Sequence, residues 1–210
     1  MNENATLVKF GEYKHIRQLQ SEGLLYMNNL PYFQKIEDNE LRGDKFDGIA
    51  HVRRGNSGIV VPKDELDKPL TVTKWVIRQN PPQPEKINIF CMCAVHPLVG
   101  SFLVDEGNLR FGEHALILQK PQEFIDRVSS YLKSEKITHK ANLVEYVSND
   151  YRGEIGPFRK LMNFTYQSEW RLVCFNGPGN VREIRIGSIK DISVIAASSE
   201  VNERLRVLLK

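Results

Sequence analysis

The sequence predicts an α+β fold, with a mixed or largely antiparallel sheet of short strands and four or five flanking helices. Three observations lead to this prediction. Many short apolar segments are separated by turn residues, only a few stretches have helical periodicity, and the two kinds do not alternate as in a doubly wound parallel sheet. A chain of 210 residues suffices for one well-filled core. We therefore expect residues 1–210 to form a single domain.

Between residues 6 and 48 the sequence predicts a strand, a helix, a second strand, a second helix and a loop, in that order. The stretch Tyr13–Glu22 has apolar residues at helical spacing, and Gly23 is placed to end that helix. Asn29 can cap a second helix, expected from Leu30 to Asp38. Short strands are expected at 7–10 and 24–28, and an ordered loop rich in Gly and Asp at 42–48.

The remaining elements follow from apolar runs and turn signals. The proline-rich stretch 80–84 must interrupt any strand, because proline lacks the amide donor that a strand ladder needs. Before it, strands are expected at 59–61 and 71–77. After it, we expect strands at 87–95, 111–118, 143–147, 169–175, 182–186 and 192–196, and helices at 121–133, 157–164 and 201–209.

Composition narrows the class of protein. The hydrophobic fraction of 41% is typical of a globular chain. No apolar run approaches the roughly 20 residues that span a bilayer, and the N-terminus lacks the pattern of a signal peptide, so no membrane partner is expected. The odd count of three cysteines favours a reducing compartment, and we expect a cytoplasmic protein. The net charge of +3 is spread along the chain and does not select a partner.

The first candidate site is the polar turn Gln167-Ser168-Glu169, which opens into an apolar strand. Residues two apart in an extended segment point to the same side, so Gln167 can orient a substrate while Glu169 carries the charge. A carboxylate fixed at the mouth of a strand suits chemistry that builds positive charge on a substrate. The alternative is that Glu169 and Arg171 are exposed, or pair with charges on neighbouring strands.

The second candidate site is the loop that contains Arg42, Asp44 and Asp47. The planar guanidinium of Arg42 is suited to a phosphate or pyrophosphate, and the two acids could position it. The same acids could bind a divalent metal, but their spacing differs from that of a calcium loop, so no metal site is assigned. A turn whose aspartates bond their own backbone is the structural alternative.

Aromatic residues form the third candidate site. Tyr26, Tyr32 and Phe33 could sandwich a flat heterocycle, although aromatic residues more commonly fill cores. Because Tyr32 and Phe33 are adjacent on a predicted helix, we expect at most one of them to face a ligand.

Two segments resemble a widespread group of bacterial proteins of unassigned function, often found among mobile and phage-defence genes. The N-terminal segment is Leu24-Leu25-Tyr26-Met27-Asn28-Asn29-Leu30-Pro31-Tyr32-Phe33, followed by Glu37-Asp38, Arg42-Gly43-Asp44 and Asp47-Gly48. The C-terminal segment comprises Phe158, Lys160, Phe164 and Tyr166-Gln167-Ser168-Glu169-Trp170-Arg171-Leu172. Together the matched positions span most of the chain.

The turn Gln167-Ser168-Glu169 is also similar, more distantly, to the Q-x-E turn of ADP-ribosyltransferases. This resemblance implies that NAD is a substrate, that Glu169 is catalytic and that Gln167 positions the acceptor. It also implies that Tyr166 or Phe164 lines the turn and that Tyr26 takes a central strand position. The family has an Arg or His on its first strand, where this chain has Lys9 and Phe10, with His15 slightly later and Arg42 as a substitute.

These features favour an ADP-ribosyltransferase-like enzyme, a toxin or phage-defence effector that transfers ADP-ribose from NAD to a macromolecular acceptor. The acceptor can be nucleic acid or protein, and such a role allows a neutralising antitoxin. The first alternative is a non-enzymatic module that senses a nucleotide or a phage component. The second is a metal-dependent nuclease that uses Asp44, Asp47 and Glu37.

Overall fold

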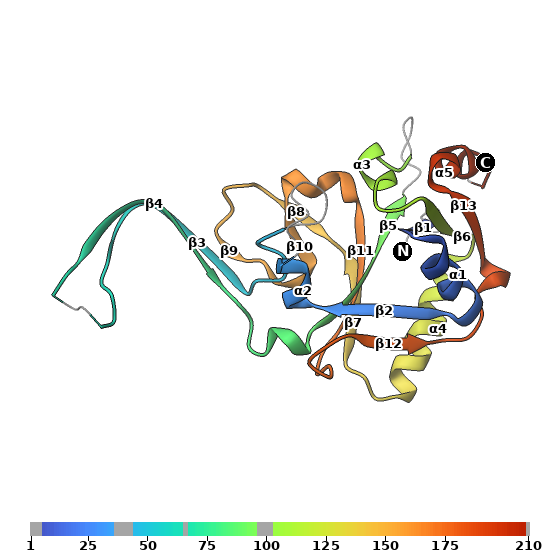
Figure 1. The fold of residues 1–210 in the computed structure, drawn as a ribbon, viewed down its shortest axis with the longest axis horizontal. Helices are drawn as coiled ribbons and strands as arrows, with labels where there is room; N and C mark the ends of the chain where they lie inside the picture. The colour runs from blue at the N-terminus through green and yellow to red at the C-terminus, as the bar shows by residue number, and fades with distance from the viewer. Residues whose placement is uncertain (1–5, 36–43, 65–66, 96–102, 209–210) are drawn as a thin grey trace.

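The main sheet forks at its central strand. In the computed structural model, which describes residues 6–35, 44–64, 67–95 and 103–208, β11 (Glu169–Cys174) pairs antiparallel along one edge of β5 (Asn88–Val95). On the other edge, β2 (Leu24–Asn29) pairs with the first two residues of β5, and β1 (Thr6–Gly11) pairs with its last three. Neither strand pairs with residues 90–92, so β1 and β2 diverge there (Figure 1).

Four further strands extend this sheet to eight. β6 (His114–Leu118) pairs with β1, and β13 (Ser193–Ala197) pairs with β6. β12 (Arg182–Arg185) pairs with β2, and β7 (His139–Leu143) pairs with β11. All of these pairings are antiparallel, which agrees with the largely antiparallel sheet of short strands predicted from the sequence.

Alternation along the strands builds two apolar cores. One contains Trp170, Leu172 and Cys174 of β11 together with the inward faces of α1 (Tyr13–Glu22) and α4 (Pro121–Ser134). The other contains alternate residues of β1 and β6, which pack against α5 (Val201–Leu208). Because side chains of a strand point alternately to its two sides, helices can cover both faces of this sheet.

Smaller elements complete the fold. The short helix α2 (Leu30–Lys35) follows β2, and α3 (Glu106–Leu109) precedes β6. β8 (Glu145–Val147) pairs in parallel with β10 (Arg159–Leu161). β3 (His51–Val60) and β4 (Leu70–Gln79) form a long hairpin that projects from the body, and β9 (Gly153–Glu154) pairs only with its base (Figure 1).

The predicted α+β class is confirmed, as are most of its elements. The helix Tyr13–Glu22 ends at Gly23, whose φ of 62° is left-handed, as a glycine stop requires. The backbone N–H of Tyr32 donates to Asn29 Oδ1 (3.2 Å), so Asn29 caps α2 as expected. The last three residues of the predicted helix 30–38 lie outside the described residues. The predicted strand 143–147 is split, because β7 ends at Leu143 and β8 begins at Glu145.

The helix predicted at 157–164 is wrong. This segment holds a 3-10 turn at Gly156–Phe158, then β10, then a longer 3-10 turn at Met162–Gln167. Within it, Lys160 is only 6% exposed. A buried ammonium needs acidic partners, and a three-residue strand brings Lys160 to them.

Among the described residues, no helix has the length and apolar character needed to cross a bilayer.

Candidate functional site

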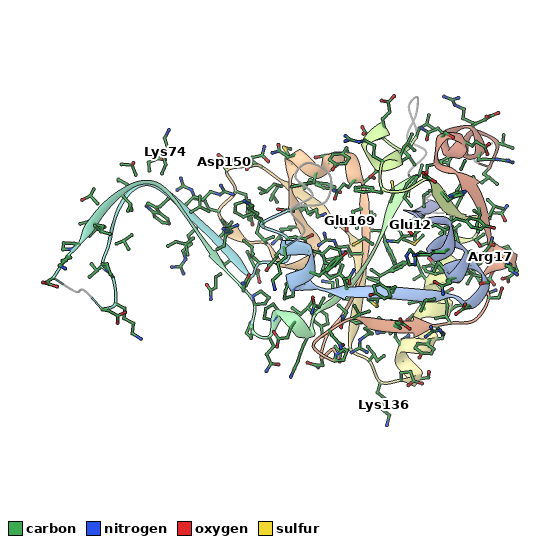
Figure 2. All side chains as sticks on the ribbon, viewed as in Figure 1. Glu12, Arg17, Lys74, Lys136, Asp150 and Glu169 are labelled. Atoms are coloured by element: carbon green, nitrogen blue, oxygen red, sulfur yellow. The ribbon has the colours of Figure 1, made fainter. Side chains whose placement is uncertain are left out.

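A cleft of about 770 Å³ opens at the fork of the main sheet. Its lining comes from β1, α1, β2, α2 and β5, and the turn that leads into β11 supplies polar side chains. Figure 2 shows Glu169 within the body of the molecule, where β11 lies beside β5. The cleft therefore forms where two strands separate from a common neighbour and leave part of its edge uncovered.

Lys9 bonds the part of the β5 edge that the fork leaves without a neighbouring strand. A strand edge without a neighbour leaves backbone groups that need other partners. The ammonium of Lys9 donates to the backbone carbonyl of Cys91 (2.8 Å) and lies 4.8 Å from the ring centroid of Phe90. Lys9 therefore lines the cleft and also supports the uncovered edge of β5.

Arg171 is the centre of a buried ionic network. It is 1% exposed and uses all five of its N–H donors. Two donate to Asp47 in a bidentate pair, Nη1 to Oδ1 at 2.6 Å and Nη2 to Oδ2 at 2.8 Å. Two donate to Glu169, Nε to Oε1 at 2.6 Å and Nη2 to Oε2 at 3.2 Å, and one donates to the carbonyl of Pro157 at 2.8 Å. Arg171 therefore fixes both carboxylates.

Lys160 contacts both candidate residues of the turn, Gln167 and Glu169. Its ammonium donates to Gln167 Oε1 at 2.6 Å and forms an ion pair with Glu169 Oε2 at 2.8 Å. Its nitrogen also lies 3.6 Å from Asp47 Oδ2. The two cations, Lys160 and Arg171, thus balance the two acids, Asp47 and Glu169. A buried network with matched charges and satisfied donors is rigid.

The turn itself is held by the neighbouring strand. Ser168 has a left-handed φ of 42°, so the chain reverses before β11 begins. Its hydroxyl donates to the carbonyl of Ala94 (2.7 Å), and the Ala94 N–H donates to the carbonyl of Ser168 (2.6 Å). The N–H of Glu169 donates to the hydroxyl of Tyr146 (2.9 Å). Gln167 and Glu169 do converge, but through Lys160 and a turn rather than through an extended segment.

The network sets the charge of Glu169. Burial alone would raise the pKa of Glu169, but Arg171 and Lys160 outweigh burial and hold this pKa well below its usual range. Burial would lower the pKa of Lys160, yet Glu169 and Asp47 raise it above its usual value. Arg171 and Lys160 therefore favour the ionised form of Glu169, which acts as a hydrogen-bond acceptor in this network.

Aromatic side chains form the open part of the cleft. Tyr26 of β2 is 52% exposed and Tyr32 of α2 is 46% exposed, and both line the cleft. Phe33 lines it as well, so the prediction that at most one of Tyr32 and Phe33 faces the ligand is wrong. The reason is that their rings pack edge to face, with centroids 5.6 Å apart, at the end of a six-residue helix.

Other predicted residues lie elsewhere. Asp44 is buried and does not line the cleft, because its Oδ1 accepts from the N–H of Phe46 (2.8 Å) within its own turn. Burial and the neighbouring Asp47 raise the pKa of Asp44 to about 6. Tyr166 packs against Gly107 instead of the cleft. Arg42 and Glu37 lie outside the described residues.

Two members of the network have roles that the sequence alone does not predict. From the sequence, Asp47 is a candidate for a phosphate or metal site, and Lys160 appears only in the C-terminal resemblance. Glu169 and Arg171 were expected, as the alternative to a catalytic role, to be exposed or to pair with charges on neighbouring strands; both are buried, and they bind each other. No local pattern indicates Asp47 as the second acid, since it lies 124 residues from Arg171.

Comparisons with protein-family models, with curated proteins and with solved structures found no match to this chain. The function is therefore argued from the cleft itself.

Proposed function

We propose that this chain is an ADP-ribosyltransferase-like enzyme, a cytoplasmic toxin or phage-defence effector that transfers ADP-ribose from NAD to a macromolecular acceptor. One observation carries the proposal. Glu169 and Gln167 share a single cleft with Tyr26, Tyr32 and Phe33. A fixed carboxylate and an aromatic wall in one cleft suit a ligand that has a flat ring next to a sugar.

The proposed chemistry uses Glu169 as a permanent negative charge. The glycosidic bond between the ribose C1′ and the nicotinamide nitrogen breaks, and nicotinamide leaves with the bonding electron pair. The ribose becomes cationic, and a hydroxyl or amine of the acceptor forms the new bond at C1′ and releases its proton to solvent. Glu169 accepts a hydrogen bond from a ribose hydroxyl and stabilises the positive charge. Removing one such preorganised group typically lowers kcat by roughly 10² to 10³.

Arg171 and Lys160 are positioning residues in this proposal. They hold both Glu169 oxygens before substrate binds, so little reorganisation is needed during the reaction. Each carboxylate oxygen can accept two hydrogen bonds. Oε1 accepts one from Arg171; the Cys91 thiol, a weak donor, also hydrogen-bonds this carboxylate, and in this proposal the ribose hydroxyl takes its place.

A sensing module is the second candidate, and the balanced network favours it. Asp47 and Glu169 are matched by Lys160 and Arg171, a stable arrangement that does not require turnover. Such a module would bind NAD or ADP-ribose between the aromatic side chains without releasing nicotinamide.

The nuclease alternative has less support. Within the described residues, no three His, Cys, Asp or Glu side chains lie together as a metal site would need. Asp47 and Glu169 do approach one another, but the Arg171 guanidinium binds both of them. A cation held in this position competes with a metal for the same oxygens.

The decisive experiment combines turnover with binding. Purified protein is incubated with radiolabelled NAD and bacterial lysate, and nicotinamide release and transferred label are measured. Thermal shift with NAD and ADP-ribose reports binding separately. We expect release and transfer for the wild-type chain. A thermal shift without released nicotinamide would establish the sensing module instead, and the absence of both would reject both functions.

Two variants assign the residues. Glu169→Gln keeps the shape but removes the charge, and we expect nicotinamide release to fall at least about 100-fold. Glu203→Gln, on the exposed side of α5, is the matched control. Since Glu169→Gln also disturbs the network, Tyr26→Ala provides a test at an exposed position. It should weaken NAD binding without lowering Tm, whereas Tyr13→Ala, another exposed tyrosine outside the cleft lining, should leave binding unchanged.

A further inference from the structure

A second, smaller recess lies on the face of the main sheet opposite the cleft. Its volume is about 220 Å³, and its lining comes from Ile125, Val128 and Ser129 of α4, His139, Lys140 and Ala141 of β7, and Trp170 and Leu172 of β11. Side chains of a strand alternate between its two faces, so Trp170 and Leu172 face this recess while Glu169 and Arg171 face the cleft. The two cavities therefore share β11 but have no lining residue in common.

The recess forms because the edge strand carries a small residue at this point. β7 pairs with β11 and, among the described residues, with no other strand. Ala141 of β7 lies opposite Leu172 in this pairing, and α4 packs its buried residues over the same face of the sheet. The methyl group of Ala141 is too short to fill the space between β11 and α4, so the space stays open.

The lining includes a buried N–H donor without a partner. Trp170 is only 3% exposed, and within the described residues its indole nitrogen makes no hydrogen bond. Nearly all buried polar groups in proteins are hydrogen-bonded. The nitrogen is not fully enclosed, and the recess is the cavity that this indole lines. A bound molecule with an acceptor atom at this place satisfies a donor that folding leaves unpaired.

Two further polar groups line the recess. The hydroxyl of Ser129 has no hydrogen-bond partner among the described residues either, and a hydroxyl can both donate and accept. Nδ1 of His139 lies 2.9 Å from the carbonyl oxygen of Ile137. Since a carbonyl oxygen only accepts, Nδ1 carries the proton, and Nε2 of the neutral ring is an acceptor. The lining thus contains both donors and an acceptor.

The charges of the lining favour a neutral ligand. Of the described residues that line the recess, none is acidic, and Lys140 is the one lysine. Lys140 pairs with Val173, and its ammonium lies 5.3 Å from the ring centroid of Phe158, which packs against Val173 in a separate core cluster. Strand alternation therefore directs the Lys140 side chain away from the recess, to the side of the sheet that carries the cleft.

We propose that this recess is a ligand site for a neutral molecule that consists of a single aromatic ring and a carboxamide group. A cavity of about 150 Å³ holds a benzene ring, so about 220 Å³ holds a ring with one such substituent. The ring packs against Ile125, Val128 and Leu172. The carboxamide oxygen accepts from the indole of Trp170, and the carboxamide N–H groups donate to Nε2 of His139. A carboxamide suits this lining because its donor and acceptor are separate atoms.

The test is a titration of the full-length protein with benzamide, followed by tryptophan fluorescence. The chain has two tryptophans, and Trp75 lies on β4 of the projecting hairpin, so Trp75→Phe leaves Trp170 as the sole emitter. We expect a saturable change in emission with a Kd of about 1 mM or lower. In the otherwise wild-type chain, Trp170→Phe keeps a ring but removes the donor, and calorimetry should show a Kd raised by about fivefold.

Two serine variants on one helix assign the site. Ser129→Leu fills the recess and should abolish the fluorescence change, whereas Ser130→Leu, at an exposed residue outside the lining, should preserve it. Neither should lower Tm, because leucine is the stronger helix former. Tyr26→Ala separates this site from the cleft, where the proposed function also allows benzamide to bind, and it should leave the Trp170 signal unchanged.

Three outcomes would overturn the proposal: no saturable change with benzamide, binding that survives Ser129→Leu, and binding that is lost in Tyr26→Ala. The first two exclude a ligand in the recess, and the third places the ligand in the cleft. None of them bears on nicotinamide release from NAD, so the recess and the proposed function stand or fall separately.

Discussion

Replacing Arg171 with Met should be the most destabilising change in the cleft. The variant keeps an unbranched side chain but removes all five hydrogen bonds of the guanidinium. Asp47 and Glu169 then lose the cation between them, although Lys160 remains close to both. Breaking a buried ion pair by removing one partner costs about 3–5 kcal/mol, because the other charge stays buried. The total stability of a domain is only about 5–15 kcal/mol.

The expected loss is readily measured. For a chain of this length, each kcal/mol lowers Tm by about 2–4 °C, so a loss of about 3–5 kcal/mol corresponds to roughly 6–20 °C. Thermal unfolding followed by circular dichroism gives Tm directly. Arg127→Met is the control, since Arg127 on α4 makes ion pairs with Glu123 and Asp191 on the surface. Its Tm should change far less, because exposed pairs contribute little.

A second substitution tests the cause. If the buried negative charge is responsible, Asp47→Asn should recover part of the stability that Arg171→Met loses, because only Glu169 then remains ionised and Lys160 can balance it. A Tm for Arg171→Met within about 2 °C of the wild type would refute the reasoning, since such a change corresponds to no more than about 1 kcal/mol. Additive losses in the double variant would refute the electrostatic explanation alone.

Two further perturbations test other parts of the fold. Burial and the neighbouring Asp47 raise the pKa of Asp44 to about 6, so the folded state binds the proton more tightly than the unfolded chain. Stability therefore falls as pH rises from about 4 through 6. Asp44→Asn should therefore stabilise the protein at pH 8 but not at pH 4, and urea unfolding that shows equal effects at both would contradict this. Gly23→Ala should destabilise the chain by more than about 1 kcal/mol, because φ is 62° and the new Cβ would lie 2.2 Å from the carbonyl oxygen of Gly187; an unchanged urea midpoint would show that this turn relaxes freely.

Local signals were sufficient for much of the fold. The helical spacing before Gly23 fixed the limits of α1, and the capping side chain of Asn29 marked the start of α2. The helix predicted at 157–164 failed because proline followed by mixed polar and apolar residues is ambiguous between a helix and successive turns. The burial of Lys160 within this segment depends on two acids, Asp47, which is distant in sequence, and Glu169, which follows a turn.

The cleft depended even more on tertiary structure. Glu169 and Gln167 could be proposed from the turn that precedes β11, and Tyr26 from its strand. The fork between β1 and β2 could not be predicted, because strand order is not encoded in any local pattern. The same fork decides which predicted residues reach the cleft, so Tyr32 and Phe33 line it while Tyr166 and Asp44 do not.

The fork also explains why the cleft is polar at its floor. Where β1 and β2 separate, β5 lacks a neighbour on one edge, and an apolar floor would leave its backbone groups without partners. Lys9 satisfies the carbonyl of Cys91, and the strand on the opposite edge brings Glu169 and Arg171 to the same region. The charges of Glu169 and Arg171 are buried and fixed beside the cleft, the condition under which a charge acts most strongly on a ligand. If the proposed function holds, stability and ligand chemistry depend on the same residues, and for this reason the exposed Tyr26, rather than Glu169, provides the cleaner test of function.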